Sequence, residues 1–204
     1  MLLLDMIENR SLSSFWKYVP RPSRGEVSVS VFTNPATGAE ESAQAYIAGT
    51  LALLGDSDPL TVLRQGPSAF EQLMNGSSPE DLRRPEAPGK WSAAALAQHM
   101  ADSETTWAYR LRMVLAHDRP TLAGYDQDAW AERLRYMDAD PAEALTRFGV
   151  VRRANLALLE SLAPQEWDRV SVHSERGEES VKHMTRLYAG HDLVHRRQMA
   201  RILG

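Results

Sequence analysis

Two histidines near the end of the chain are the first residues whose spacing suggests chemistry. In the stretch 180–203, SVKHMTRLYAGHDLVHRRQMARIL, His191 and His195 are separated by one helical turn. Imidazoles spaced in this way can chelate a metal ion, as they do in H-E-x-x-H helices. The residue after His191 is Asp192, so that protease motif is not met, and two ligands do not complete a site. A buried histidine pair satisfied by hydroxyl or backbone groups is the structural alternative.

The two histidines belong to a stripe that should face the protein interior. Side chains at steps of three or four residues form this stripe: Met184, Tyr188, His191, His195, Met199 and Ile202. A further imidazole, His99, points inward on another predicted helix, and helical bundles build metal sites from facing side chains. Three protein ligands with an open position are typical of catalytic zinc, whereas structural zinc sites are closed by a fourth ligand.

The remaining histidines favour other positions. His117 ends a predicted helix, where the helix dipole favours an imidazolium, and His183 lies on the flank of the stripe. His173 belongs to a predicted loop that leads into the last helix, so it would either overhang the site or be an exposed loop residue.

Composition limits the class of protein. The chain has 204 residues, of which 43% are apolar and 25% charged, as in one soluble globular domain with or without an appendage. A net charge of −4 argues against a nucleic-acid binder, and no apolar run could span a membrane. Without cysteine, a metal would be bound by His, Asp or Glu, and histidine favours zinc, nickel, copper or iron. The opening MLLLDMI is a poor signal peptide, so we expect a cytoplasmic protein.

Residues 1–42 differ from the rest of the chain, because Pro, Gly and Ser interrupt any regular period. The alternating segment VSVSVF at 27–32 is typical of a strand, but a lone strand has no partner. We therefore expect an irregular or disordered extension over 1–42, followed by one domain over 43–204.

From residue 43 onward the pattern is helical. Short helices are predicted at 43–55 and 128–137, a single turn within 77–92, and a loop over 163–177. Long amphipathic helices are predicted at 59–74, 92–117, 141–162 and 180–203. No paired strand is predicted after residue 43, so the fold class is all-α, a four-helix bundle.

Capping residues mark where these helices begin and end. Asp58 and Asp140 each precede a proline, which is typical of an N-cap followed by the first helical residue. Gly55 is a suitable residue just beyond a helix end. The pair Gly66 and Pro67 is expected to bend the helix at 59–74.

Four segments resemble the DinB-like/YfiT-like metalloprotein superfamily: GKWSAAALAQHMADSE (89–104), YRLRMVLAHDRP (109–120), YDQDAWAERL (125–134) and YAGHDLVHRRQM (188–199). The His-x-x-Asp-Ser-Glu of the first and the His-Asp-x-x-His of the last occur in the family's order and spacing. The likeness covers roughly 43–204, and residues 1–42 have no counterpart in the pattern. The resemblance implies an up-down-down-up bundle, often a homodimer. It places a divalent ion, zinc or nickel with iron or manganese as alternatives, on His99, His191 and His195.

The resemblance also implies a chemistry, since characterised members of the family transfer low-molecular-weight thiols, as bacillithiol S-transferases and mycothiol-dependent isomerases do. A metal can deprotonate a coordinated thiol, which fits a protein that has no cysteine of its own. We therefore expect a transferase that moves a small-molecule thiol onto an electrophile in stress or detoxification. A metal also lowers the pKa of bound water from ~15.7 towards ~7, so hydrolysis is the alternative reaction. A metal-binding or interaction module without turnover is the alternative class.

Candidates for catalytic support are Asp102, Tyr188 and His173. Asp102, one turn from His99, would accept an imidazole N–H or be a solvated acid. Tyr188, one turn before His191, would bring its hydroxyl near the metal or be a core residue.

Three further charged residues lie on the predicted helices that carry the histidines. Arg110 lies beyond His99 on the same face, and would meet either a substrate carboxylate or, by preference, a bundle acid such as Asp126 or Asp128. Glu104 lies well round the helix from His99 and receives little weight. Arg196 is expected at the surface.

Overall fold

The computed structural model describes residues 40–204, with side chains from Gln44 onward. The first helix, α1 (Glu40–Leu54), begins three residues before its predicted start at residue 43. The strand-like segment 27–32 and nearly all of the predicted irregular extension therefore lie outside the described residues. No helix in the described part of the chain is long and apolar enough to cross a membrane.

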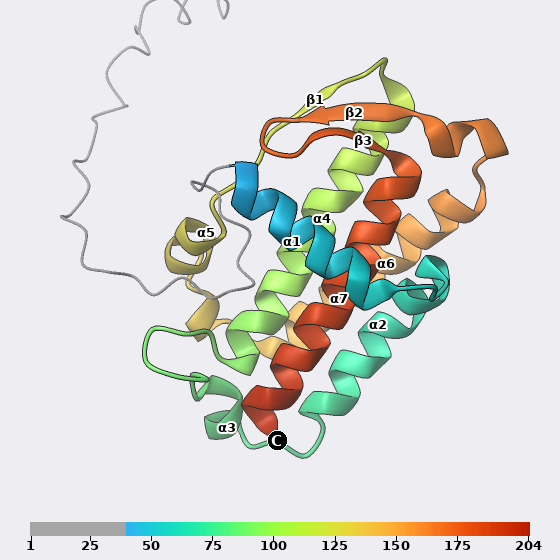
Figure 1. Ribbon diagram of the computed structural model, residues 1–204. Helices are drawn as coiled ribbons and strands as arrows, with labels where there is room; N and C mark the ends of the chain where they lie inside the picture. Colours follow the sequence, from blue (N-terminus) through green and yellow to red (C-terminus); the bar gives the residue numbers. More distant parts are fainter. Residues whose placement is uncertain (1–39) are drawn as a thin grey trace, which may run out of the picture.

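Four long helices form the bundle that the sequence predicts. They are α2 (Pro59–Met74), α4 (Ala93–Ala116), α6 (Pro141–Glu160) and α7 (Val181–Leu203). In Figure 1, α2 and α7 run towards the same end of the bundle, while α4 and α6 both run the opposite way. This is the predicted up-down-down-up order, and α1 packs across α7 outside it.

The long helices begin where their capping residues predict. The backbone N–H of Thr61 donates to the Asp58 carboxylate at 2.9 Å, and that of Ala142 donates to Asp140 at 2.9 Å. Each satisfies a donor that the first turn of a helix leaves unpaired. Gly55 follows α1 with a φ of 56°, a left-handed conformation that glycine adopts without strain.

Short elements join the helices. The connection between α2 and α4 contains α3 (Pro79–Arg83), as predicted. The helix predicted at 128–137 is split into α5 (Gln127–Arg133) and a 3-10 turn, η1 (Tyr136–Asp138). Arg135 separates the two with a φ of 55°, a conformation that an α-helix cannot continue through.

A small sheet corrects the prediction that no strands pair after residue 43. Strand β2 (Val170–His173) pairs in parallel with β1 (Thr121–Leu122) and antiparallel with β3 (Gly177–Ser180). The strands have two to four residues, and β2 buries its polar members Ser171 and His173 rather than its valines. Because the buried positions of β2 are polar, an alternating apolar pattern does not reveal this strand. The predicted loop also contains a 3-10 turn, η2 (Pro164–Asp168).

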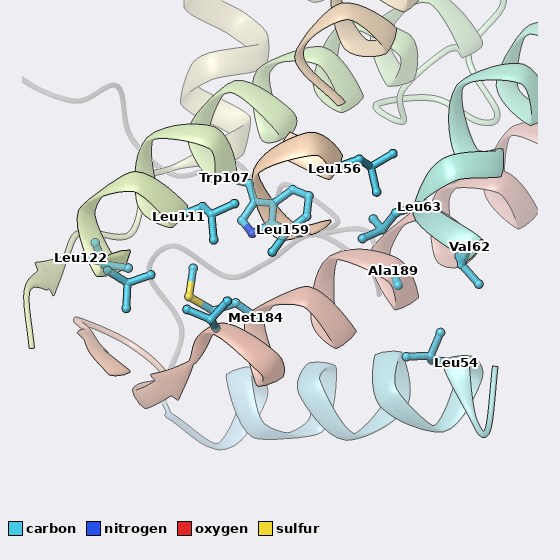
Figure 2. Close-up of a cluster of buried hydrophobic side chains, with 12 residues drawn as sticks. Leu54, Val62, Leu63, Trp107, Leu111, Leu122, Leu156, Leu159, Met184 and Ala189 are labelled. Carbon is cyan, nitrogen blue, oxygen red and sulfur yellow. The ribbon is translucent and has the colours of Figure 1, made fainter. Parts of the chain in front are cut away.

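The apolar core has two parts. One surrounds Trp107, with side chains from α2, α4, α6 and α7 converging on it (Figure 2). The other surrounds Phe70, which meets Phe148 edge-on with ring centroids 5.9 Å apart. Between the two parts, the helices contribute a polar layer of buried side chains: Glu104, Arg152, Asn155 and Asp192. This layer and the histidines beside it occupy the middle of the bundle.

Candidate metal centre

The structure brings the three predicted histidines together. His99 comes from α4, and His191 and His195 come from α7, so two segments far apart in sequence meet. One ring nitrogen from each of the three lies within 4.8 Å of the other two. The Nε2 atoms of His99 and His191 are 3.2 Å apart. Nitrogen ligands at ~2.0–2.1 Å in tetrahedral zinc would be separated by roughly 3.3 Å, so this spacing fits a shared ion.

Burial keeps the imidazoles neutral. His99 is 1% exposed and His195 is 3% exposed. Burial lowers the pKa of His195 to about 4. Burial, together with the neighbouring imidazoles, holds the pKa values of His99 and His191 well below their usual range. A neutral imidazole offers a lone pair to a metal, so the electrostatics prepare these groups as ligands.

Gln198 orients one of the three rings, and the sequence reading did not find it. The Gln198 Oε1 atom lies 2.9 Å from His195 Nδ1. Gln198 as a whole is 4% exposed. An amide oxygen only accepts, so Nδ1 carries the proton and Nε2 is left free for a metal. Partners of this kind fix the tautomer and direction of metal-binding histidines. The signal available in the sequence was its place three residues after His195.

The candidate site has three ligand side chains among the described residues. No carboxylate of the described residues joins the histidines to make a fourth ligand. Among the described residues, nothing hydrogen-bonds to the buried Nδ1 of His191. The Trp91 ring lies beside His99, with ring centroids 4.9 Å apart. Three neutral imidazoles and a free position suit a divalent metal ion of the catalytic kind.

The three candidates for catalytic support lie in different places. Asp102 is bound by Gln98 and by Arg147 at 2.9 Å, and none of its hydrogen bonds among the described residues reaches His99. Tyr188 stacks on Trp107 with ring centroids 4.5 Å apart, and its ring centroid is 6.1 Å from that of His191.

His173 is not in a loop but in β2, and it is 2% exposed. Its Nδ1 accepts the Glu175 N–H at 3.2 Å. Burial, helped by Arg176 and Arg110, lowers its pKa to about 3, so it is neutral. It is therefore a buried strand residue rather than the exposed loop residue that was the alternative.

Glu104, which was expected to have little role, belongs to the buried polar layer. Its carboxylate accepts from Arg152 at 2.8 Å and from Asn155 at 2.8 Å. Arg152 also donates to Asp192 at 2.6 and 3.0 Å. Burial lowers the pKa of Arg152, but Asp192 and Glu104 outweigh this and raise it above its usual value. The layer ties α4, α6 and α7 together beside the histidines.

Arg110 does not form the ion pair that was expected of it. Asp126 instead caps α5 by accepting the Ala129 N–H, and no described acid forms an ion pair with Arg110. The guanidinium donates to the Ala123 carbonyl at 2.6 Å. Arg196 is half-buried rather than fully at the surface.

A small cavity of about 50 Å³ adjoins the histidines, and His191 is part of its wall. Residues from α1, α4, α5, α7 and two loops form the rest: Tyr46, Ser103, Arg110, Tyr125, Gln127, Arg176, Met184, Leu187 and Tyr188. A molecule in this cavity would lie directly beside the His191 imidazole.

The fold and the site define a class: a four-helix-bundle protein with an open three-histidine centre. Comparison with known families agrees, since the model of the DinB superfamily matches residues 63–199. The chain belongs to the DinB superfamily, as its resemblance predicted.

Individual relatives support the same placement. YfiT of Bacillus subtilis is 25% identical over 149 residues, which cover 71% of this chain and 84% of YfiT. OB0782 of Oceanobacillus iheyensis is 28% identical over 117 residues, 57% of this chain and 67% of the relative. Both are provisionally named as metal-dependent hydrolases. The solved structure of YfiT, described as an unusual four-helix bundle, matches with a TM-score of 0.67 at 21% identity over 91% of each chain, which shows the shared fold.

Proposed function

We propose that this protein is a divalent-metal-dependent enzyme that activates a small nucleophile at His99, His191 and His195. The observation that supports it is the convergence of three neutral imidazoles within 4.8 Å, beside a cavity that one of them lines. The provisional names of the relatives add support, since they describe metal-dependent proteins. A purely structural metal would be closed by a fourth protein ligand.

The chain's own residues hold and shield the ion. His195 presents Nε2 because Gln198 accepts its Nδ1–H, and the facing Nε2 atoms of His99 and His191 complete the donor set. The Trp91 ring packs beside His99 and would shield one side of the ion. A divalent ion bound there supplies Lewis acidity, which lowers the pKa of a coordinated water or thiol. The cavity beside His191 holds the second reactant close, so that the reaction becomes effectively intramolecular.

We infer that the nucleophile is a low-molecular-weight thiol transferred to an electrophile. The chain has no cysteine, so a thiol would have to arrive as a cosubstrate, as in the transferases that the sequence resembles. Hydrolysis by water is the second candidate, and the names of the relatives favour it. Three imidazoles suit zinc or nickel, with iron or manganese as alternatives. A cytoplasmic homodimer is part of the same proposal.

Cobalt substitution of the purified protein tests both parts. The expected result is a thiolate-to-cobalt absorption band when small thiols are added, together with thiol consumption by electrophiles. If no such band appears and the protein cleaves activated esters, the proposed thiol transfer is wrong and hydrolysis is the reaction. A cobalt spectrum that responds to neither would indicate a binding module.

Metal content of three variants tests the site itself. His99→Ala and His195→Ala should lose the metal, while His117→Ala, at the exposed end of α4, should retain it. Full occupancy in both ligand variants would overturn the assignment.

A further inference from the structure

The geometry points to a substrate subsite: the cavity beside His191 binds the carboxylate of a small monoanionic molecule through Arg110. This inference rests on the proposed function, because it names the chemical class of the reactant placed beside the metal.

Two guanidinium groups line the cavity, and only one is neutralised. Arg176 forms a bidentate pair with Glu179, at 2.6 and 2.8 Å, and the side chains are 9% and 1% exposed. Arg110 is 4% exposed and forms no ion pair with any acid of the described residues. One positive charge in the wall is therefore unbalanced.

The contacts of Arg110 do not replace an acid. Its Nη2 donates to the Ala123 carbonyl, its side chain is hydrogen-bonded with the Tyr188 hydroxyl, and its guanidinium carbon lies 5.8 Å from the centre of the Tyr125 ring. An arginine cannot shed its proton to escape burial, and an uncompensated buried charge is strongly destabilising. Such a charge is explained most simply by an anion that binds it in the working protein.

The neighbouring groups are suited to the same ligand. Tyr46, Tyr125 and Tyr188 share the cavity wall. Burial raises the pKa of Tyr46 to about 12 and the pKa values of Tyr125 and Tyr188 above their usual range, so all three stay neutral donors. A planar carboxylate matches the fork of a guanidinium, and its single charge matches the one unbalanced cation. A phosphate would bring more negative charge than the single unbalanced cation can neutralise.

Calorimetric titration of the full chain tests the inference without relying on activity. The probes are straight-chain monocarboxylates from acetate to hexanoate, the matching primary amides, and inorganic phosphate. Each is titrated into metal-free and zinc-loaded protein, so that binding to the metal itself is separated from binding to Arg110. The expected result is carboxylate binding in both forms, no amide binding, and phosphate weaker than carboxylate.

Variants assign the binding to one side chain. Arg110→Gln should weaken carboxylate binding by at least about tenfold, as expected for a charge-assisted pair, and should keep its zinc. Arg153→Gln, on the exposed side of α6, is the control and should bind as the wild type does. Equal affinity in Arg110→Gln, tighter phosphate binding, or no carboxylate binding at millimolar concentrations would each overturn the inference.

A stability measurement separates a ligand-binding arginine from a structural one. If the role of Arg110 is to bind an anion, its charge is unpaired in the ligand-free protein. Arg110→Met should then raise the melting temperature of the ligand-free protein, because an unpaired buried charge is removed. A lower melting temperature would mean that Arg110 is structural and would contradict the inference. The outcomes are distinct from failure of the proposed function: loss of the metal site would leave carboxylate binding to the metal-free protein intact.

Discussion

The Arg152 guanidinium on α6 donates two hydrogen bonds, of 2.6 and 3.0 Å, to the Asp192 carboxylate on α7. Asp192 directly follows the candidate ligand His191. The side chains of Arg152 and Asp192 are both 1% exposed. Gly66 on α2 lies against them, and a Cβ there would overlap the Asp192 carboxylate. The pair therefore fixes the rotation of α7, and with it the direction of His191.

Asp192→Asn should destabilise the fold and weaken metal binding together. Losing the charge-assisted hydrogen bonds between Arg152 and Asp192 costs about 1.5–3 kcal/mol, while Arg152 keeps its pair with Glu104. Urea unfolding gives the stability, and a chelator competition gives the affinity. The matched control is Asp102→Asn, whose pair with Arg147 is partly exposed, with 45% exposure on the arginine; it should change stability by less than ~1 kcal/mol. Equal losses in both variants would contradict the role of the buried pair.

Gln198→Leu should lower zinc affinity by roughly 10–100-fold, because His195 loses the acceptor that fixes its tautomer. Competition with a coloured chelator measures the change. Gln198→Glu is the control, since it retains an acceptor for His195 Nδ1–H and should hold zinc at least as well. If Gln198→Leu binds zinc like the wild type, the 2.9 Å contact does not orient the ring.

His173 should make the protein sensitive to acid. Its pKa is about 3 in the folded protein, lowered by burial first and by Arg176 and Arg110 next, against ~6.5 when unfolded. The unfolded chain therefore binds more protons in this window, so the stability that neutral His173 provides is complete above pH ~6.5 and is lost as the pH falls towards 3.

The comparison of wild type with His173→Asn isolates this effect, because the three candidate ligand histidines titrate equally in both proteins. Asparagine keeps an acceptor near the position of Nδ1 but does not titrate. Free energies of unfolding at a series of pH values should fall less steeply on the acid side in the variant. Parallel pH profiles would show that His173 is not buried as described.

Gly190→Ala should displace α1 from α7. A Cβ at Gly190 would collide with the Thr50 carbonyl, which is backbone and cannot move aside cheaply. Since Tyr46 of α1 lines the cavity, amide exchange in α1 should rise and ligand binding should weaken, while the metal is retained. Gly49→Ala is the control: nothing lies within 4 Å of its Cβ, so the change should stabilise α1 by about 0.5–1 kcal/mol. Unchanged exchange in Gly190→Ala would contradict the close approach.

Prediction from sequence failed where polar residues occupy interior positions. Arg152 is fully buried, whereas its apolar neighbour Val151 is only half-buried. A charged side chain such as Arg152 is expected at the surface. The helical period alone does not show whether Val151 or Arg152 points inward. Only the carboxylates brought by α4 and α7 make burial of Arg152 possible, and no local pattern reports them. The strand β2 was missed for the same reason, since its buried residues are Ser171 and His173.

The sequence by itself determined the helices, their caps and the inward position of the three histidines, because apolar period and capping chemistry act over a few neighbouring residues. Tertiary structure decided the rest. Gln198 became an orienting group, Asp192 an ion-pair partner and Arg110 an unpaired charge in a cavity wall only once distant segments had packed. Interactions across the bundle depend on which faces meet, and that is a property of the whole fold.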